Sequence, residues 1–178
     1  MISRYRTIVA VLASTIAASM IAFFASSSYL NGQTRIIYSL EKRQNDKEII
    51  RLIDGARKYA YFAVYTFTKG DIADALARAK KRGVAVRGVI DRSQAESGYE
   101  SDVLERLSRA GIPVEFQKHE DGIMHVKALV TESACALGSY NWTSAATNAN
   151  DEMLEITTNA SLRSQCFDII ADILVANR

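Results

Sequence analysis

Short apolar runs alternate with stretches of helical periodicity along most of this chain, and this alternation is the feature that most constrains its fold. Four runs have strand character: residues 35–39, 60–67, 84–90 and a short run that begins at Pro113. Between them, apolar residues recur at helical spacing after Asp46, after Asp71 and around Leu104. Strands that alternate with helices in this way form a sheet with helices packed on its faces.

The rhythm changes in the last third of the chain. Two short strands, expected at 125–131 and 134–137, have the spacing of a hairpin. A strand at 153–158 and an amphipathic helix at 162–174 follow. The element order predicts an α/β fold over residues 35–178, with a mixed β-sheet flanked by helices on both faces.

The N-terminal 34 residues differ in composition from the rest. Residues 8–25 carry no charge, 15 of these 18 residues are apolar, and Arg4 and Arg6 precede them. A positive flank before an apolar run is typical of a signal peptide or a membrane anchor, and a buried helix of the soluble domain is the alternative. We expect residues 1–34 to comprise such a hydrophobic helix and a short linker. The domain would then be exported, either to the periplasm, anchored to the inner membrane facing the periplasm, or secreted.

Charge and cysteine content exclude several classes of protein. Beyond residue 34 the chain carries 20 basic and 20 acidic side chains, so any anionic partner must be held by a local cluster. Two cysteines are too few for a disulfide scaffold or a four-cysteine zinc site. Cys135 and Cys166 both fall on apolar faces, which favours core packing over a reactive thiol. Their separation in space is not predictable from the sequence.

Two basic side chains suit an anionic ligand. His125 and Lys127 are two residues apart, so they project from the same face of a predicted strand. Burying an ammonium group costs several kcal/mol unless an anion accompanies it. An anionic substrate would resolve this cost.

Further polar residues follow at the ends of the next two predicted elements. Gly138, Ser139 and Asn141 provide a turn, a hydroxyl and an amide suited to an oxyanion, and Glu152 offers a carboxylate to fix an imidazole. Considered without any family pattern, these residues favour a solvated surface hairpin over an anion site. Trp142 would either stack on a base or seal the cleft.

The spacing of these residues resembles the H-K-D motif of the phospholipase D superfamily, H-x-K-x(4)-D followed by G-S/G-x-N. The matching stretches are His125-x-Lys127, Gly138-Ser139-x-Asn141 and Asn150-x-Glu152. Residues 65–68, 79–84 and 89–91 also resemble the small bacterial nonspecific endonucleases of that superfamily. The resemblance covers roughly residues 35–173. It departs at Glu132, which stands where the family has a supporting aspartate, and this change predicts lowered or absent activity.

The resemblance implies a metal-independent phosphodiester hydrolase with no cofactor. Two histidines would act on one phosphodiester, one forming a phosphohistidine and the other protonating the leaving oxygen. Catalysis would fall to His125, Lys127 and Glu152, with Lys127, Ser139 and Asn141 as the phosphate ligands and Glu132 and Gly138 in support. Since the chain holds one motif copy, the resemblance also implies a homodimer with a composite active site.

Three functions remain open at this point. The first is a nonspecific endonuclease acting on DNA or RNA, and the neutral charge of the domain speaks mildly against it. The second is a phospholipase D that hydrolyses phospholipid headgroups, which a membrane anchor would favour. The third is a membrane-tethered binding dimer without catalysis, for which Glu132 is the only support.

Overall fold

The structure is a computed structural model that describes residues 32–118 and 121–178. Most of the expected signal peptide or membrane anchor, residues 1–31, lies outside the described residues, as does His119. Within the described part of the chain, no helix has both the length and the apolar character needed to cross a membrane.

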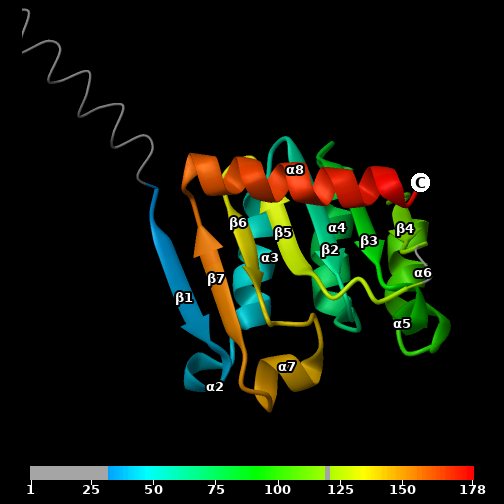
Figure 1. The fold of residues 1–178 in the computed structure, drawn as a ribbon, viewed down its shortest axis with the longest axis horizontal. Coiled ribbons are helices and arrows are strands. Elements are labelled where there is room, and N and C mark those ends of the chain that lie inside the picture. Colours follow the sequence, from blue (N-terminus) through cyan, green and yellow to red (C-terminus); the bar gives the residue numbers. More distant parts are fainter. Residues whose placement is uncertain (1–31, 119–120) are drawn as a thin grey trace, which may run out of the picture. The chain divides into compact units, whose positions relative to one another are not determined.

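Seven strands form one mixed sheet in the order β1-β7-β6-β5-β2-β3-β4 (Figure 1). β2, β3 and β4 run parallel, whereas β5, β6, β7 and β1 join the sheet through antiparallel pairs. The strands are β1 (Thr34–Tyr38), β2 (Tyr59–Val64), β3 (Ala85–Ile90), β4 (Val114–Phe116), β5 (Lys127–Thr131), β6 (Cys135–Gly138) and β7 (Met153–Thr157). The predicted mixed α/β sheet is confirmed.

Helices cover both faces of the sheet, and Figure 1 shows α8 running across the strands. The helices are α2 (Ser39–Lys42), α3 (Asn45–Gly55), α4 (Gly70–Lys81), α5 (Arg92–Glu96), α6 (Ser101–Arg109), α7 (Ser144–Asn148) and α8 (Ala160–Ala176). Two apolar clusters separate the layers, one under α3, α4 and α6 and the other under α8. Neighbouring residues of β2 divide between them, since Phe62 joins the first cluster and Ala63 the second. This two-sided burial explains the continuous apolar run of β2.

Three short helices were not expected from the sequence: α2, α5 and α7. α2 has no side-chain cap, whereas α5 and α7 are each defined by a capping side chain rather than by an apolar stripe. Asp91 caps α5 by accepting hydrogen bonds from the backbone N–H groups of Ser93 and Gln94. Thr143 caps α7 by accepting one from the backbone N–H of Ala146. Helices of five residues are too short for helical periodicity to reveal them.

The prediction that His125 lies within a strand is wrong by two residues, because β5 begins at Lys127. The segment before β5 is held by other means. The Met124 N–H donates to Asp91 Oδ2 at 2.9 Å, and the Tyr65 N–H donates to the Val126 carbonyl at 2.8 Å. His125 therefore sits on a connection tied to the ends of β2 and β3.

All the site residues predicted from the sequence except Glu132 lie near one end of the strands. The carboxyl ends of β1, β2, β3 and β6 meet the amino ends of β5 and β7 there. The short helices α2 and α7 lie beyond this end of the strands in Figure 1.

Candidate active site

Lys127 is a nearly buried cation, with 6% of its surface exposed. Its Nζ donates to the His125 carbonyl at 2.7 Å and lies 4.9 Å from the centre of the Tyr65 ring. Burial lowers the pKa of Lys127, and the negative charge of Glu152 opposes this shift. None of the ion pairs found among the described residues includes Lys127. A desolvated ammonium group that contacts a carbonyl and the face of a ring is suited to bind an anion.

The side chains of His125 and Lys127 both lie against the ring of Tyr65. Tyr65 was not predicted from the sequence as a site residue. The exposed His125 ring lies 4.7 Å from the Tyr65 ring, centre to centre. The Tyr65 hydroxyl accepts a hydrogen bond from Gln94 Nε2 at 3.1 Å, and the Thr66 hydroxyl donates to Gln94 Oε1 at 3.2 Å. Gln94 therefore fixes the ring against which both basic side chains rest. The feature of the sequence that could have identified Tyr65 is an aromatic residue directly after a buried strand.

Glu152 is buried, and both its carboxylate and its backbone are hydrogen-bonded. The Ser139 hydroxyl donates to its Oε2, and Asn150 Nδ2 donates to its Oε1 at 3.2 Å. Its backbone N–H donates to Ser39 Oγ, and the Ser39 N–H donates to its carbonyl, each at 2.9 Å. No hydrogen bond between Glu152 and His125 is present among the described residues, so the orienting role of Glu152 stays a prediction.

Gly138 allows the chain to place Ser139 beside Glu152. Its φ is +152°, and a Cβ built at this position would lie 2.1 Å from the Met153 carbonyl oxygen. The Ser139 N–H donates to that carbonyl at 3.1 Å, and Ser139 Oγ accepts from the Met153 N–H at 3.1 Å. Because the hydroxyl proton of Ser139 is committed to Glu152, its role as a phosphate ligand stays a prediction.

Asn141 and Trp142 tie the turn after β6 to the end of β2. Asn141 Oδ1 accepts from the Thr66 N–H at 3.2 Å, which leaves its Nδ2 as the donor group. Trp142 is 1% exposed, with ring centres 5.4 Å from Phe62 and 4.8 Å from Phe67. The buried indole seals the core and is not available to stack on a base.

Glu132 lies at the opposite end of β5 from Lys127. Its carboxylate accepts hydrogen bonds from the backbone N–H groups of Arg57 (2.7 Å), Lys58 (3.2 Å) and Tyr59 (3.4 Å). Burial acts to raise the pKa of Glu132, but these donors outweigh it and hold the pKa below its ordinary value. Glu132 thus fastens the connection between α3 and β2, and its longer side chain makes these bonds without reaching Lys127.

Asp91 is a second residue that sequence reasoning did not identify. It is 1% exposed, and its two oxygens serve different segments. Oδ2 binds the Met124 N–H next to His125, and Oδ1 binds the N–H groups of Ser93 and Gln94 in α5. One carboxylate therefore positions both His125 and the Gln94 that holds Tyr65. A polar residue directly after the predicted strand 84–90 was the available signal.

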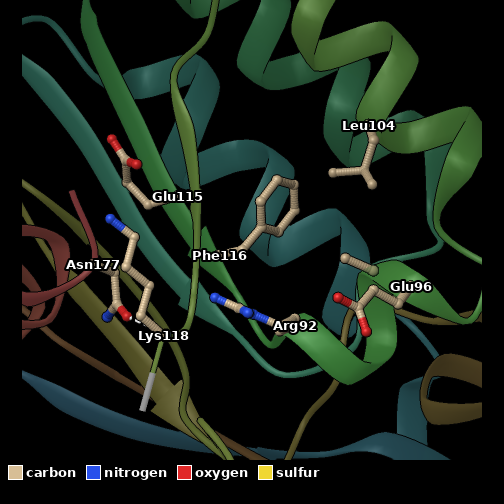
Figure 2. Close-up of a pocket in the computed structure, with 8 residues that line it drawn as sticks. Arg92, Glu96, Leu104, Glu115, Phe116, Lys118 and Asn177 are labelled. Atoms are coloured by element: carbon tan, nitrogen blue, oxygen red, sulfur yellow. Dashed lines mark hydrogen bonds between the residues drawn. The ribbon is translucent and has the colours of Figure 1, made fainter. Parts of the chain in front are cut away.

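A separate hollow of about 440 Å³ lies between β4, α5, α6 and the chain after α8 (Figure 2). Two cations and two carboxylates line it, together with apolar and amide groups: Arg92, Lys118, Glu96, Glu115, Ala95, Leu104, Phe116 and Asn177. The Lys118 N–H donates to Asn177 Oδ1 at 2.7 Å across its wall. None of the site residues predicted from the sequence lines this hollow, so it is distinct from the cluster around Lys127.

Comparison with known proteins identifies relatives with the same domain. The family model described as "Cardiolipin synthase, PLD-like domain" matches residues 49–173. A phospholipase D of Rickettsia conorii is 34% identical over 117 residues, which are 65% of this chain and 57% of that protein. A mitochondrial cardiolipin hydrolase of Chlamydomonas reinhardtii is 30% identical over 99 residues, which are 56% of this chain and 44% of that protein. The chain thus spans about half the length of these two relatives.

A solved structure extends the likeness to nearly the whole domain. The phospholipase D family member Nuc from Salmonella typhimurium superposes with a TM-score of 0.76 at 27% sequence identity, covering 83% of this chain and 97% of that one. The family model spans more than half of the chain, and the fold agrees with that of Nuc. The chain therefore belongs to the phospholipase D superfamily.

Proposed function

We propose that this chain is a phosphodiester hydrolase that acts through a phosphohistidine on His125. The supporting observation is Lys127, a desolvated cation that forms no ion pair within residues 32–118 and 121–178 and that lies against the same Tyr65 ring as His125. A phosphodiester supplies the missing negative charge at this place. Lys127 Nζ and Asn141 Nδ2 would hold the phosphoryl oxygens, where charge is greatest in the transition state.

The reaction proceeds in two displacements. An imidazole nitrogen of His125 attacks phosphorus, the bond to the leaving oxygen breaks, and a second imidazole donates its proton to that oxygen. A water molecule then gives a proton to the second imidazole and attacks phosphorus. The bond between phosphorus and His125 breaks, which returns both imidazoles to their starting state.

The second imidazole would come from another copy of the chain. The sequence contains only two histidines, and His125 alone stands in a His-x-Lys pattern. Two chains related by a two-fold axis would each present His125 to one shared phosphodiester. Mixing His125→Ala chains with wild-type chains tests this, because the mixed dimer would lack one of the two imidazoles.

Nucleic acid is the first substrate we propose. The sequence resembles small endonucleases along nearly the whole domain, and the residues of the motif suit a phosphodiester, which carries no base identity. Such a site would cleave DNA or RNA with little sequence preference. Since the domain carries balanced charge, binding would depend on the local cluster around Lys127 and weaken with salt.

A phospholipid headgroup is the second candidate, favoured by apolar side chains beside the site. Tyr38 and Met153 are direct neighbours across β1 and β7, and they are 41% and 60% exposed. Ile123, two residues before His125, is 52% exposed. Side chains of this kind suit a lipid surface. We also propose that residues 1–34 export the domain and, if retained, anchor it to the membrane, which fractionation of cells would test.

One experiment separates these readings. Wild-type protein, His125→Ala and the control His119→Ala are incubated with plasmid DNA, with RNA and with phosphatidylcholine vesicles, each with and without a chelator. We expect cleavage of nucleic acid by wild type and by His119→Ala, and none by His125→Ala. Cleavage of lipid alone would select the second candidate. Full activity of His125→Ala, or loss of activity with the chelator, would refute the mechanism. Inactivity of every protein on every substrate would favour a binding dimer.

A further inference from the structure

The two cysteines of this chain meet in the layer between α8 and the sheet. Cys135 is buried in β6, and Cys166 is half-buried on α8. Cys135 belongs to the apolar cluster that includes Val130 and Ile170, and Cys166 packs against that cluster. The two thiols lie close enough for each to shift the pKa of the other. Residues 31 positions apart in the sequence are thus brought to one contact by the docking of α8.

The two thiols differ in acidity. Interaction with the Cys166 thiol, together with burial, raises the pKa of Cys135. The same interaction lowers the pKa of Cys166, against the opposing effects of burial and of the Glu155 charge. The more exposed thiol is therefore the one that ionises first, and the thiolate is the nucleophile in disulfide exchange.

We propose that Cys135 and Cys166 form an intramolecular disulfide when the folded protein meets a small-molecule disulfide as oxidant. The Cys166 thiolate attacks one sulfur of the oxidant, whose S–S bond breaks, and the released thiolate takes up a proton. The Cys135 thiol then loses its proton, and its sulfur attacks Cys166 Sγ and expels the second thiol. The protein loses two protons and two electrons, equivalent to two hydrogen atoms, and one oxidant molecule becomes two thiols.

The cross-link would fasten the part of the chain that carries most of the candidate site. The segment from Cys135 to Cys166 contains Gly138, Ser139, Asn141 and Glu152. Closing a loop of about 30 residues restricts the unfolded chain, and for a protein of this size it corresponds to a rise in Tm of about 10 °C. An oxidising compartment, expected for an exported domain, favours this state. The inference does not depend on the proposed hydrolase activity.

Titration of thiols in the full chain tests the proposal. Protein purified with a reductant is transferred to excess oxidised glutathione under native conditions, and free thiols, intact mass and Tm are then measured. We expect loss of both thiols, a mass lower by two hydrogen atoms, a monomeric cross-link on denaturing gels, and a Tm rise that dithiothreitol reverses. The matched variants Cys135→Ala and Cys166→Ala should show no such rise.

Three outcomes would overturn the proposal. The first is two thiols that stay free in the native protein yet react once it is denatured. The second is a stable glutathione adduct on Cys166 in place of the internal bond. The third is a disulfide that joins two chains.

Discussion

Glu100 provides a test of the electrostatics beneath the candidate site. This residue precedes α6, is completely buried, and accepts a hydrogen bond from the Phe67 N–H through Oε1 at 2.6 Å. Its Oε2 has no hydrogen-bond partner among the described residues. Burial raises the pKa of Glu100 to about 7, the Phe67 N–H acts to lower it, and the charge of Asp91 raises it further. The perturbation we consider is Glu100→Gln, which removes the charge and keeps the shape.

The magnitude follows from the difference between the pKa of about 7 and the ordinary glutamate pKa of 4.5. At 1.36 kcal/mol per pH unit, ionised Glu100 costs the folded state about 3 kcal/mol. Because the folded pKa is the higher one, the two states bind protons equally below pH 4.5. Stability is then lost as the pH rises from about 4.5 to about 7, and the loss stays constant above that.

Urea denaturation from pH 4.5 to pH 8 measures this effect. The free energy of unfolding of wild type should fall by about 3 kcal/mol relative to that of Glu100→Gln across this interval. The amide brings its own cost of roughly 1–3 kcal/mol, because its NH₂ lacks an acceptor, but that cost does not vary with pH. The exposed Glu96 gives the matched control, Glu96→Gln. Parallel curves for wild type and Glu100→Gln would refute the assignment of a raised pKa to this carboxyl.

Three further substitutions probe the site and its supports. Lys127→Met should abolish hydrolysis while leaving the free energy of unfolding unchanged or raising it by about 1 kcal/mol, because it removes a buried cation for which the described part of the chain shows no ion pair. A clear loss of stability would contradict this. Gly138→Ala should destabilise the protein by about 2 kcal/mol or more in urea denaturation, since the Cβ of the alanine would overlap the Met153 carbonyl. A neutral effect would show that β6 and β7 can separate freely. Glu132→Asp should lower the free energy of unfolding by about 1 kcal/mol with kcat unchanged, because it weakens hydrogen bonds to backbone N–H groups far from Lys127. A change in kcat would show that Glu132 takes part in catalysis.

Local patterns in the sequence were sufficient for the elements that carry periodicity. The seven strands and the four longer helices each show an apolar repeat within their own residues, as in Ile49 and Ile53 of α3. The His125 and Lys127 pair was also readable, because their spacing of two is a local property. The supports around them were not readable in this way. Asp91 reaches Met124 across 33 residues, and Gln94 reaches Tyr65 across 29.

The sequence by itself determined an α/β sheet, the family and a short set of polar residues around one strand. Only the tertiary structure decided which of those residues lie close together. In the structure Lys127 and His125 lie against Tyr65, Glu132 lies at the far end of β5, and Cys135 lies close to Cys166. The physical reason is that periodicity records which face of an element is buried, whereas contacts between elements depend on how strands are ordered and helices docked.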